Sequence, residues 1–137
     1  MIPSEWHGML PIGGEIIVVE DDDILRALLA DILQDIPAQF SLFATADEAY
    51  EHVLVTELHC PLLLTDYGLP GRLNGSQLAL NFQARWPGIA IILTSGYDID
   101  PQTLPADFAY LPKPWTGQQL VELIADLLQP GFPVGQR

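Results

Sequence analysis

The chain has 137 residues, about the length of one domain, and 49% of them are apolar. This apolar content excludes a largely disordered chain, because disorder requires low hydrophobicity. Eighteen Asp and Glu against five Lys and Arg give a formal net charge of −13, which argues against a nucleic-acid-binding domain and against anionic membrane surfaces.

Both ends of the chain are rich in Pro and Gly. Residues 1–14 are expected to be a flexible leader and residues 130–137 a flexible tail, around a single domain of residues 15–129. The leader has no basic start or apolar run typical of a secretory signal, and no stretch of the chain is long enough to span a membrane. A lone cysteine, Cys60, builds no disulfide framework, so we expect a cytoplasmic location.

Short apolar runs alternate with helical patterns along this domain. The expected strands are residues 16–19, 40–43, 62–65, 89–94 and 108–111. The expected helices cover residues 24–36, about 46–57, a segment ending near 86, and 116–128. In the first helix, seven apolar residues from Ile24 to Ile36 form one stripe that ends before Pro37. Strands separated by helices form βαβ units, which predict a parallel sheet with helices on both faces.

Functional groups of such sheets gather beyond the carboxyl ends of the strands. Glu20 and Asp21 follow the first expected strand, Asp66 the third, Ser95 the fourth and Lys113 the fifth. Three carboxylates brought together repel one another, and a hard divalent cation such as Mg²⁺ relieves that repulsion. A hydroxyl and an ammonium at the same edge are suited to stabilising a phosphoryl group. Taken singly, the acids also fit helix and turn capping, and Ser95 fits an ordinary turn residue.

Four blocks of sequence carry a family resemblance: IVVEDD at 17–22, LTDYGLP at 64–70, LTSGY at 93–97 and YLPKPW at 110–115. In this order and spacing they resemble a bacterial response-regulator receiver domain, and the resemblance covers residues 15–129. It implies a flavodoxin-like α/β fold, doubly wound, with a five-stranded parallel sheet in the order 2-1-3-4-5.

The resemblance also implies a phosphorylation site. Asp66 would be the phosphoacceptor and a Mg²⁺ ligand. Asp21 would be the principal acidic ligand, Glu20 would help through water, and Gly68 would offer its backbone carbonyl.

A second group of residues would respond to the phosphoryl group. Lys113, the one lysine of the chain, would pair with the phosphoryl oxygens. Ser95 would supply the switch hydroxyl, with Tyr110 as the aromatic residue that follows it. Thr94 is the alternative hydroxyl, but strand alternation puts it on the opposite side from Ser95, and Gly96 matches the small residue that follows the switch position.

Two departures from the family pattern stand out. The loop from Asp66 to Gly75 is one residue longer than in the commonest receivers and resembles receivers of hybrid sensor kinases; the chain is a stand-alone regulator or a domain of that kind. Only seventeen residues separate Ser95 from Lys113, and three are Pro, so the fourth helix is expected to be shortened or irregular.

The predicted function is a phosphoacceptor of a two-component phosphorelay, using Mg²⁺ and a histidine kinase or histidine phosphotransfer protein as donor. We expect a phosphoryl-accepting switch rather than an enzyme, with no catalytic activity beyond removal of its own phosphoryl group. It would signal through contact with a downstream protein, as a monomer or weak dimer, without nucleic acid or membrane. The alternatives are a phosphorylation-independent adaptor with the receiver fold and, in another class, a small phosphatase with Asp66 as nucleophile.

Overall fold

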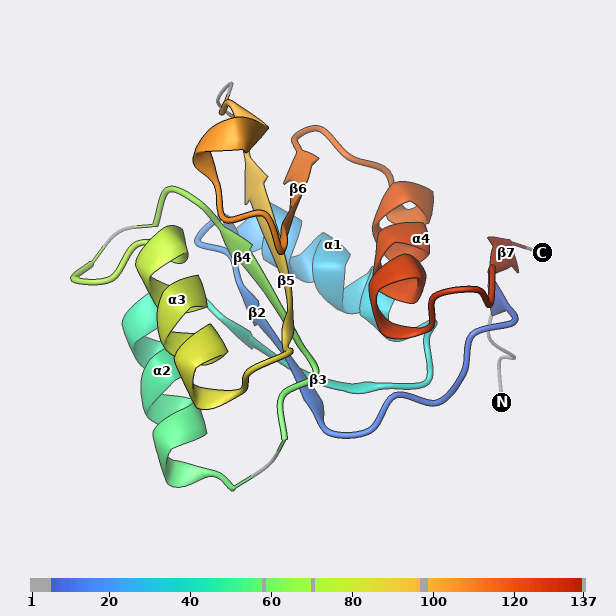
Figure 1. Cartoon of the computed structure of the whole chain (residues 1–137), viewed down its shortest axis with the longest axis horizontal. Coiled ribbons are helices and arrows are strands. Elements are labelled where there is room, and N and C mark those ends of the chain that lie inside the picture. The colour runs from blue at the N-terminus through green and yellow to red at the C-terminus, as the bar shows by residue number, and fades with distance from the viewer. Residues whose placement is uncertain (1–5, 58, 70, 97–98, 137) are drawn as a thin grey trace.

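The computed structural model describes residues 6–57, 59–69, 71–96 and 99–136, and its centre is a five-stranded parallel sheet (Figure 1). The strands of this sheet are β2 (Glu15–Val19), β3 (Gln39–Phe43), β4 (Leu62–Asp66), β5 (Ala90–Ser95) and β6 (Phe108–Pro112). They lie in the order β3-β2-β4-β5-β6. Counted within the sheet alone, this is the order 2-1-3-4-5, which confirms the predicted flavodoxin-like α/β fold.

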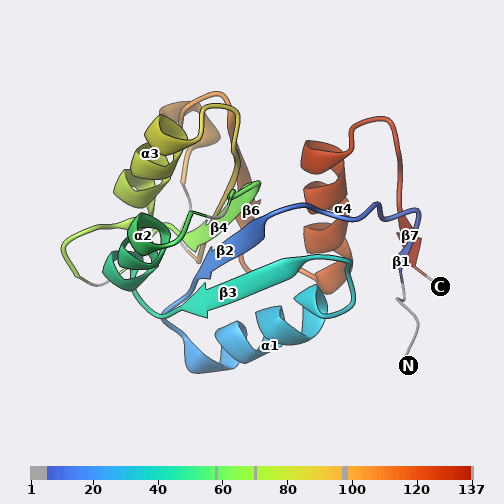
Figure 2. The ribbon, with the colours of Figure 1, turned by 90° about the horizontal axis from the view of Figure 1, so that it is seen from below.

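Helices cover both faces of the sheet (Figure 2). They are α1 (Asp23–Leu33), α2 (Ala46–Val55), α3 (Gly75–Arg85) and α4 (Gly117–Leu128). Helices α2 and α3 pack on one face and α1 and α4 on the other. Because β2 and β4 are buried on both sides, each contains a continuous apolar run, Ile16–Val19 and Leu62–Leu64, whose alternate residues enter the two core clusters.

The helices begin where capping residues stand in the sequence. The Asp22 side chain accepts hydrogen bonds from the first turn of α1, and Thr45 from that of α2. Helix α1 ends at Leu33, earlier than the predicted residue 36, and the predicted inward stripe is too wide. Ile24 is 81% exposed, because a stripe of seven positions spans more of the helix surface than the sheet covers.

Between β5 and β6 the described residues form no α-helix. Residues 99–107 contain one 3-10 turn, η1 (Pro101–Thr103), in which the backbone N–H of Thr103 donates to the carbonyl of Asp100. The predicted shortening of the fourth helix is confirmed. Residues 97 and 98, which belong to the segment where this helix was expected, lie outside the described residues.

Part of each predicted flexible end forms structure. Strand β1 (Trp6–His7) pairs antiparallel with β7 (Gly135–Gln136), so the two ends lie side by side beyond α4 (Figures 1 and 2). The side chain of Trp6 packs into the core beside α1 and α4 and is 7% exposed, which explains why this segment is held. The predicted division into a domain of residues 15–129 with flexible flanks stays a prediction.

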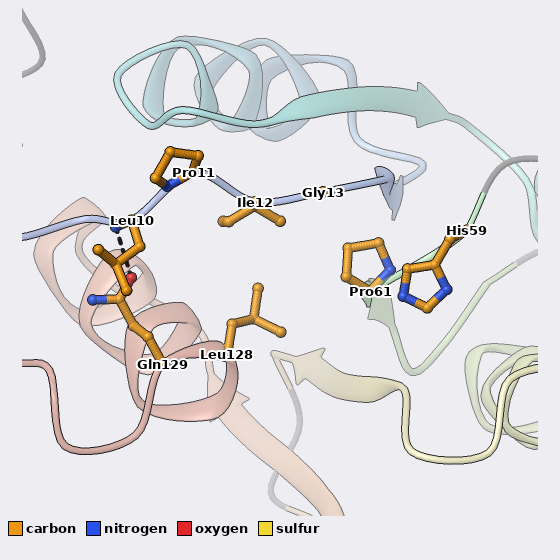
Figure 3. A pocket seen from close by; sticks show the side chains of 8 residues that line it. All are labelled: Leu10, Pro11, Ile12, Gly13, His59, Pro61, Leu128 and Gln129. Carbon is orange, nitrogen blue, oxygen red and sulfur yellow. Dashed lines mark hydrogen bonds between the residues drawn. The ribbon is translucent and has the colours of Figure 1, made fainter.

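A cavity of about 390 Å³ lies beside this terminal segment, at the amino ends of β2 and β4 (Figure 3). Its walls come from residues 10–13, from the end of α4 and from the loop before β4. It is therefore at the edge of the sheet opposite the predicted phosphorylation site. No helix in the described part of the chain is long and apolar enough to cross a membrane.

Candidate functional site

The carboxyl ends of the central strands bring the predicted acidic residues together. Val19 of β2 pairs with Thr65 of β4, so the residues that follow them, Glu20 and Asp66, are neighbours. One carboxylate oxygen from each of Glu20, Asp21 and Asp66 can lie within 4.8 Å of the other two. Glu20 is 2% exposed and Asp66 8%, whereas Asp21 is open to solvent.

Lys113 joins two of these acids from the end of β6. Its Nζ lies 2.9 Å from Oε1 of Glu20 and 3.1 Å from Oδ2 of Asp66. The backbone N–H of Lys113 donates to the carbonyl of Ser95 at 2.9 Å, which fixes the start of this loop to the end of β5. The peptide bond from Lys113 to Pro114 is cis.

Burial and hydrogen bonding shift the pKa of two of these groups. Burial raises the pKa of Glu20 above its ordinary value, and the hydrogen bond from Lys113 offsets only part of this rise. Burial alone would lower the pKa of Lys113, but the hydrogen bonds to Glu20 and Asp66 outweigh it and the pKa is raised. Lys113 therefore remains a cation, and Glu20 takes up a proton more readily than an exposed glutamate.

The two hydroxyl residues at the end of β5 lie on opposite faces of the sheet. Leu93 lies on the face covered by α2 and α3, and it pairs with Tyr110, which lies on the same face. Ser95 is two residues after Leu93, so strand alternation puts it on that face too. Thr94 pairs with Asp66 and lies on the other face. Both hydroxyl residues are buried. The register thus puts Ser95 and Tyr110 on one face, and their switch roles stay a prediction.

The loop after Asp66 runs close to the start of α3. Gly75 begins this helix, and a Cβ there would overlap the carbonyl oxygen of Asp66, so the close approach requires glycine. Gly68 lies two residues after Asp66, is exposed, and has no heavy atom within 4 Å of the place where a Cβ would stand. Because glycine has no side chain, nothing on Gly68 itself crowds its backbone carbonyl.

The donor set fits a small divalent cation. Three carboxylates at one edge of the sheet supply hard oxygen ligands, which suit Mg²⁺, and Lys113 compensates only two of them. Mg²⁺ normally takes one or two protein carboxylates and keeps several waters, so an open side is part of a suitable site. Exposure of Asp21 provides that side.

Comparison with known proteins identifies the family. Residues 16–125 match the sequence model described as the response regulator receiver domain. The chain belongs to this family. Receivers of the family act in two-component signalling, and they are typically phosphoryl-accepting switches.

Two curated relatives contain a similar segment. The sensor kinase CckA of Brucella abortus (strain 2308) and the response regulator protein FleR of Pseudomonas aeruginosa are each 29% identical to this receiver over an alignment of 118 positions that covers 83% of the chain. The matched part is 12% of the first relative and 24% of the second. The chain thus spans only a small part of the length of either relative.

Solved structures share the fold of this receiver. A response regulator receiver protein from Sinorhizobium medicae WSM419 has a TM-score of 0.78 at 22% identity, covering 85% of this chain and 94% of that one. A receiver domain protein described as CheY-like, from Methanospirillum hungatei JF-1, has a TM-score of 0.73 at 26% identity, with coverage of 85% and 94%.

Three contacts near the site of the receiver were missed by sequence reasoning. Arg26 donates from Nη1 to the backbone carbonyl of Glu20 at 2.9 Å and from Nη2 to Asp23 at 2.5 Å. The i,i+3 spacing of Asp23 and Arg26 could have indicated the second contact. The third missed contact joins Asp47 of α2 to the backbone N–H of Arg72, and no sequence pattern links residues so far apart.

Proposed function

We propose that this receiver accepts a phosphoryl group on Asp66 in a Mg²⁺-dependent reaction. The observation that supports it most is the joint position of Asp66, the Glu20 and Asp21 carboxylates and the Lys113 ammonium at one edge of the sheet. The proposed donor is a phosphohistidine on a histidine kinase or a histidine phosphotransfer protein. A bound Mg²⁺ would supply positive charge to the phosphoryl oxygens.

In the proposed reaction an Oδ of Asp66 attacks the phosphorus atom. A bond forms between that oxygen and phosphorus, the P–N bond of the donor breaks, and the imidazole leaves with the electron pair. Lys113 holds the Asp66 carboxylate before the reaction and would hold a phosphoryl oxygen after it. Glu20, Asp21, Asp66 and the carbonyl of Gly68 would be the metal ligands.

Ser95 is the proposed switch hydroxyl and Tyr110 the proposed aromatic partner. A hydrogen bond from Ser95 to a phosphoryl oxygen would favour one arrangement of this face, and Tyr110 would follow because it lies on the same face. Thr94 remains the alternative hydroxyl. The output would be contact with a downstream protein, and the proposed location is the cytoplasm.

Incubation with Mg²⁺ and a small phosphodonor such as acetyl phosphate, followed by measurement of the intact mass, tests this function. We expect one labile adduct of roughly 80 Da, the mass that one phosphoryl group adds, and its loss in Asp66→Asn or with excess chelator. Rapid turnover of the phosphodonor without an adduct would instead favour a phosphatase, and absence of any reaction would favour an adaptor.

A further inference from the structure

The loop from Tyr67 to Asn74 carries the proposed backbone ligand of the metal. Its two ends are fixed by hydrogen bonds: the N–H of Tyr67 donates to the carbonyl of Thr94 at 2.8 Å, and Asn74 caps α3. Gly68 has no side chain that could hold it in place. The direction of its carbonyl therefore depends on how the rest of the loop is anchored.

Asp47 anchors the middle of this loop from another element. Helix α2 begins beside the loop (Figures 1 and 2), and Oδ2 of Asp47, in its first turn, accepts a hydrogen bond of 3.2 Å from the backbone N–H of Arg72. The preceding residue, Gly71, has a φ of 104°. A Cβ on Gly71 would lie 2.8 Å from Oδ2 of Asp47, so the anchored conformation depends on glycine at this position.

Packing supports the same attachment. Leu69 and Leu73 are half-buried and pack against the core cluster that α2 and α3 share with the sheet. These two side chains hold the loop near the core, while the hydrogen bond to Asp47 fixes the backbone between them. Between its ends, the described part of the loop thus has a directional contact with α2 in the hydrogen bond to Asp47.

We propose that Asp47 is a positioning residue for the metal site, holding the loop so that the Gly68 carbonyl faces the carboxylates. The proposal rests on the proposed function, since it gives that carbonyl a role in binding Mg²⁺. Without the anchor the loop spends part of its time in other conformations. The apparent affinity for the metal then falls in proportion to the population of the competent one.

A simpler role for Asp47 is to stabilise the N-terminal turn of α2 through its negative charge. Two variants separate the roles. Asp47→Ala removes both the charge and the hydrogen-bond acceptor, whereas Asp47→Asn removes the charge and keeps an acceptor oxygen. Glu51→Ala is the matched control, because Glu51 is an exposed acid on the same helix and lies outside the loop contact.

The test is a Mg²⁺ titration of the full chain and these variants, with amide exchange of Arg72 measured in the metal-free state. Asp47→Ala is expected to weaken Mg²⁺ binding about 3- to 10-fold and to speed exchange at Arg72 by a similar factor, as loss of one hydrogen bond allows. Asp47→Asn and Glu51→Ala are expected to stay within about twofold of the parent in both measurements. Gly71→Ala, which crowds the same contact from the loop side, is expected to weaken binding as Asp47→Ala does.

Three results would overturn the proposal, and they are distinguishable. Parent-like Mg²⁺ affinity in Asp47→Ala would show that the anchor does not act on the metal site, while the proposed function would stand. Equal weakening in Asp47→Asn and Asp47→Ala would assign the effect to charge rather than to the hydrogen bond. Failure of the parent chain itself to bind Mg²⁺ would remove the proposed function and this inference together.

Discussion

Asp21 differs from the other two acids of the cluster because it is open to solvent and is not bridged by Lys113. Glu20 and Asp66 share one ammonium between them, so the negative charge of the cluster exceeds its compensation. Among the carboxylates of the proposed metal site, Asp21 is therefore the one whose substitution is expected to disturb packing least.

We expect Asp21→Asn to weaken Mg²⁺ binding at least about tenfold, because it removes a charged ligand. In the metal-free state the same substitution relieves repulsion and is expected to raise the melting temperature, by about 3 °C. Titration followed by tryptophan fluorescence, with thermal unfolding in chelator, measures both effects. Unchanged affinity in a folded variant would remove Asp21 from the ligand set.

The two hydroxyl residues of β5 make separate predictions because they lie on opposite faces. Ser95→Ala is expected to leave Mg²⁺ binding within about twofold of the parent and to suppress the spectral change that a phosphoryl mimic induces at Tyr110. Thr94→Ala is expected to retain that change. Nuclear magnetic resonance spectra with and without beryllofluoride measure it, and the opposite pattern in the two variants would transfer the switch role to Thr94.

The raised pKa of Glu20 predicts how metal binding depends on pH. Burial lifts this pKa above the ordinary value of 4.5, so Glu20 is protonated at a higher pH than an exposed glutamate. We therefore expect the affinity for Mg²⁺ to fall as the pH is lowered through this raised pKa. The stability of the metal-free protein depends on pH in the opposite direction. Because the pKa of Glu20 is raised, the folded state binds the proton more tightly than the unfolded state does. The stabilisation from this proton is complete below the pKa of Glu20 in the unfolded chain, and it is lost as the pH rises through the pKa in the folded protein.

Mg²⁺ titrations between about pH 7 and pH 4 test this dependence on Glu20. Lys113→Ala is expected to move the fall in affinity to higher pH, since it removes the hydrogen bond that lowers the pKa of Glu20. An affinity that stays constant down to the range in which exposed glutamate titrates would contradict the role of Glu20.

At the scale of elements, the segment between β5 and β6 is the main difference from a regular βα repeat. Its described part has the single turn η1 and is attached to α3 through a hydrogen bond from Gln83 to Asp107. Leu104 packs against the core, but most of its neighbours in this segment are exposed. The segment begins just after Ser95, the proposed switch residue. Residues 99–107 of this segment are separated from Ser95 by residues 96–98.

We expect the backbone amides of residues 99–107 to exchange quickly in the unmodified protein and about 5- to 100-fold more slowly with beryllofluoride. That factor corresponds to a change of about 1 to 2.7 kcal/mol, which is the size expected for one or two hydrogen bonds, one of them to a charged group. The amides of β5 serve as the internal reference. Strong protection of residues 99–107 before the mimic is added would show that this segment is rigid and does not switch by ordering.

Sequence patterns predicted the elements well where local chemistry decides them. The continuous apolar runs predicted strands β2 and β4 to within a residue or two. The starts of α2 and α4 were predicted equally well from their capping residues, Thr45 and Thr116. Periodicity could not predict that Ile24 would be exposed, because the width of the buried face depends on how far the sheet extends beneath α1.

The candidate site was predictable in its residues but not in its supporting contacts. Parallel strands deliver their following residues to one edge, which is why Glu20, Asp66 and Lys113 could be placed together from sequence. The hydrogen bond from Arg72 to Asp47 depends on the path of a loop, and such paths leave no periodic trace in the sequence.

At the scale of the whole molecule, the two ends of the chain are joined next to α4. Gln129, 7% exposed, accepts a hydrogen bond from the backbone N–H of Leu10 and donates to the carbonyls of Gly8 and Phe132. One side chain thus links the end of α4 to the segments that lead to β1 and β7. The proposed phosphorylation site lies at the opposite edge of the sheet, so this link concerns stability.

Gln129→Ala is expected to lower the free energy of unfolding by about 2 kcal/mol, because it removes three partly buried hydrogen bonds. Gln118→Ala, on an exposed position of the same helix, is the matched control and is expected to change it by less than about 0.5 kcal/mol. Denaturant unfolding of both variants measures the difference. Equal stability of the two would show that the terminal pairing contributes nothing.

The most direct test of the proposed function locates the phosphoryl group on the chain. After reaction with Mg²⁺ and acetyl phosphate, borohydride reduction converts a phosphorylated aspartate to homoserine, and trypsin cleaves after Arg26 and Arg72 to give a peptide of residues 27–72 that contains Asp66. Homoserine at position 66, formed only when Mg²⁺ is present, is the predicted result. Modification at Asp21 or at any other carboxylate, or the same yield without Mg²⁺, would contradict it.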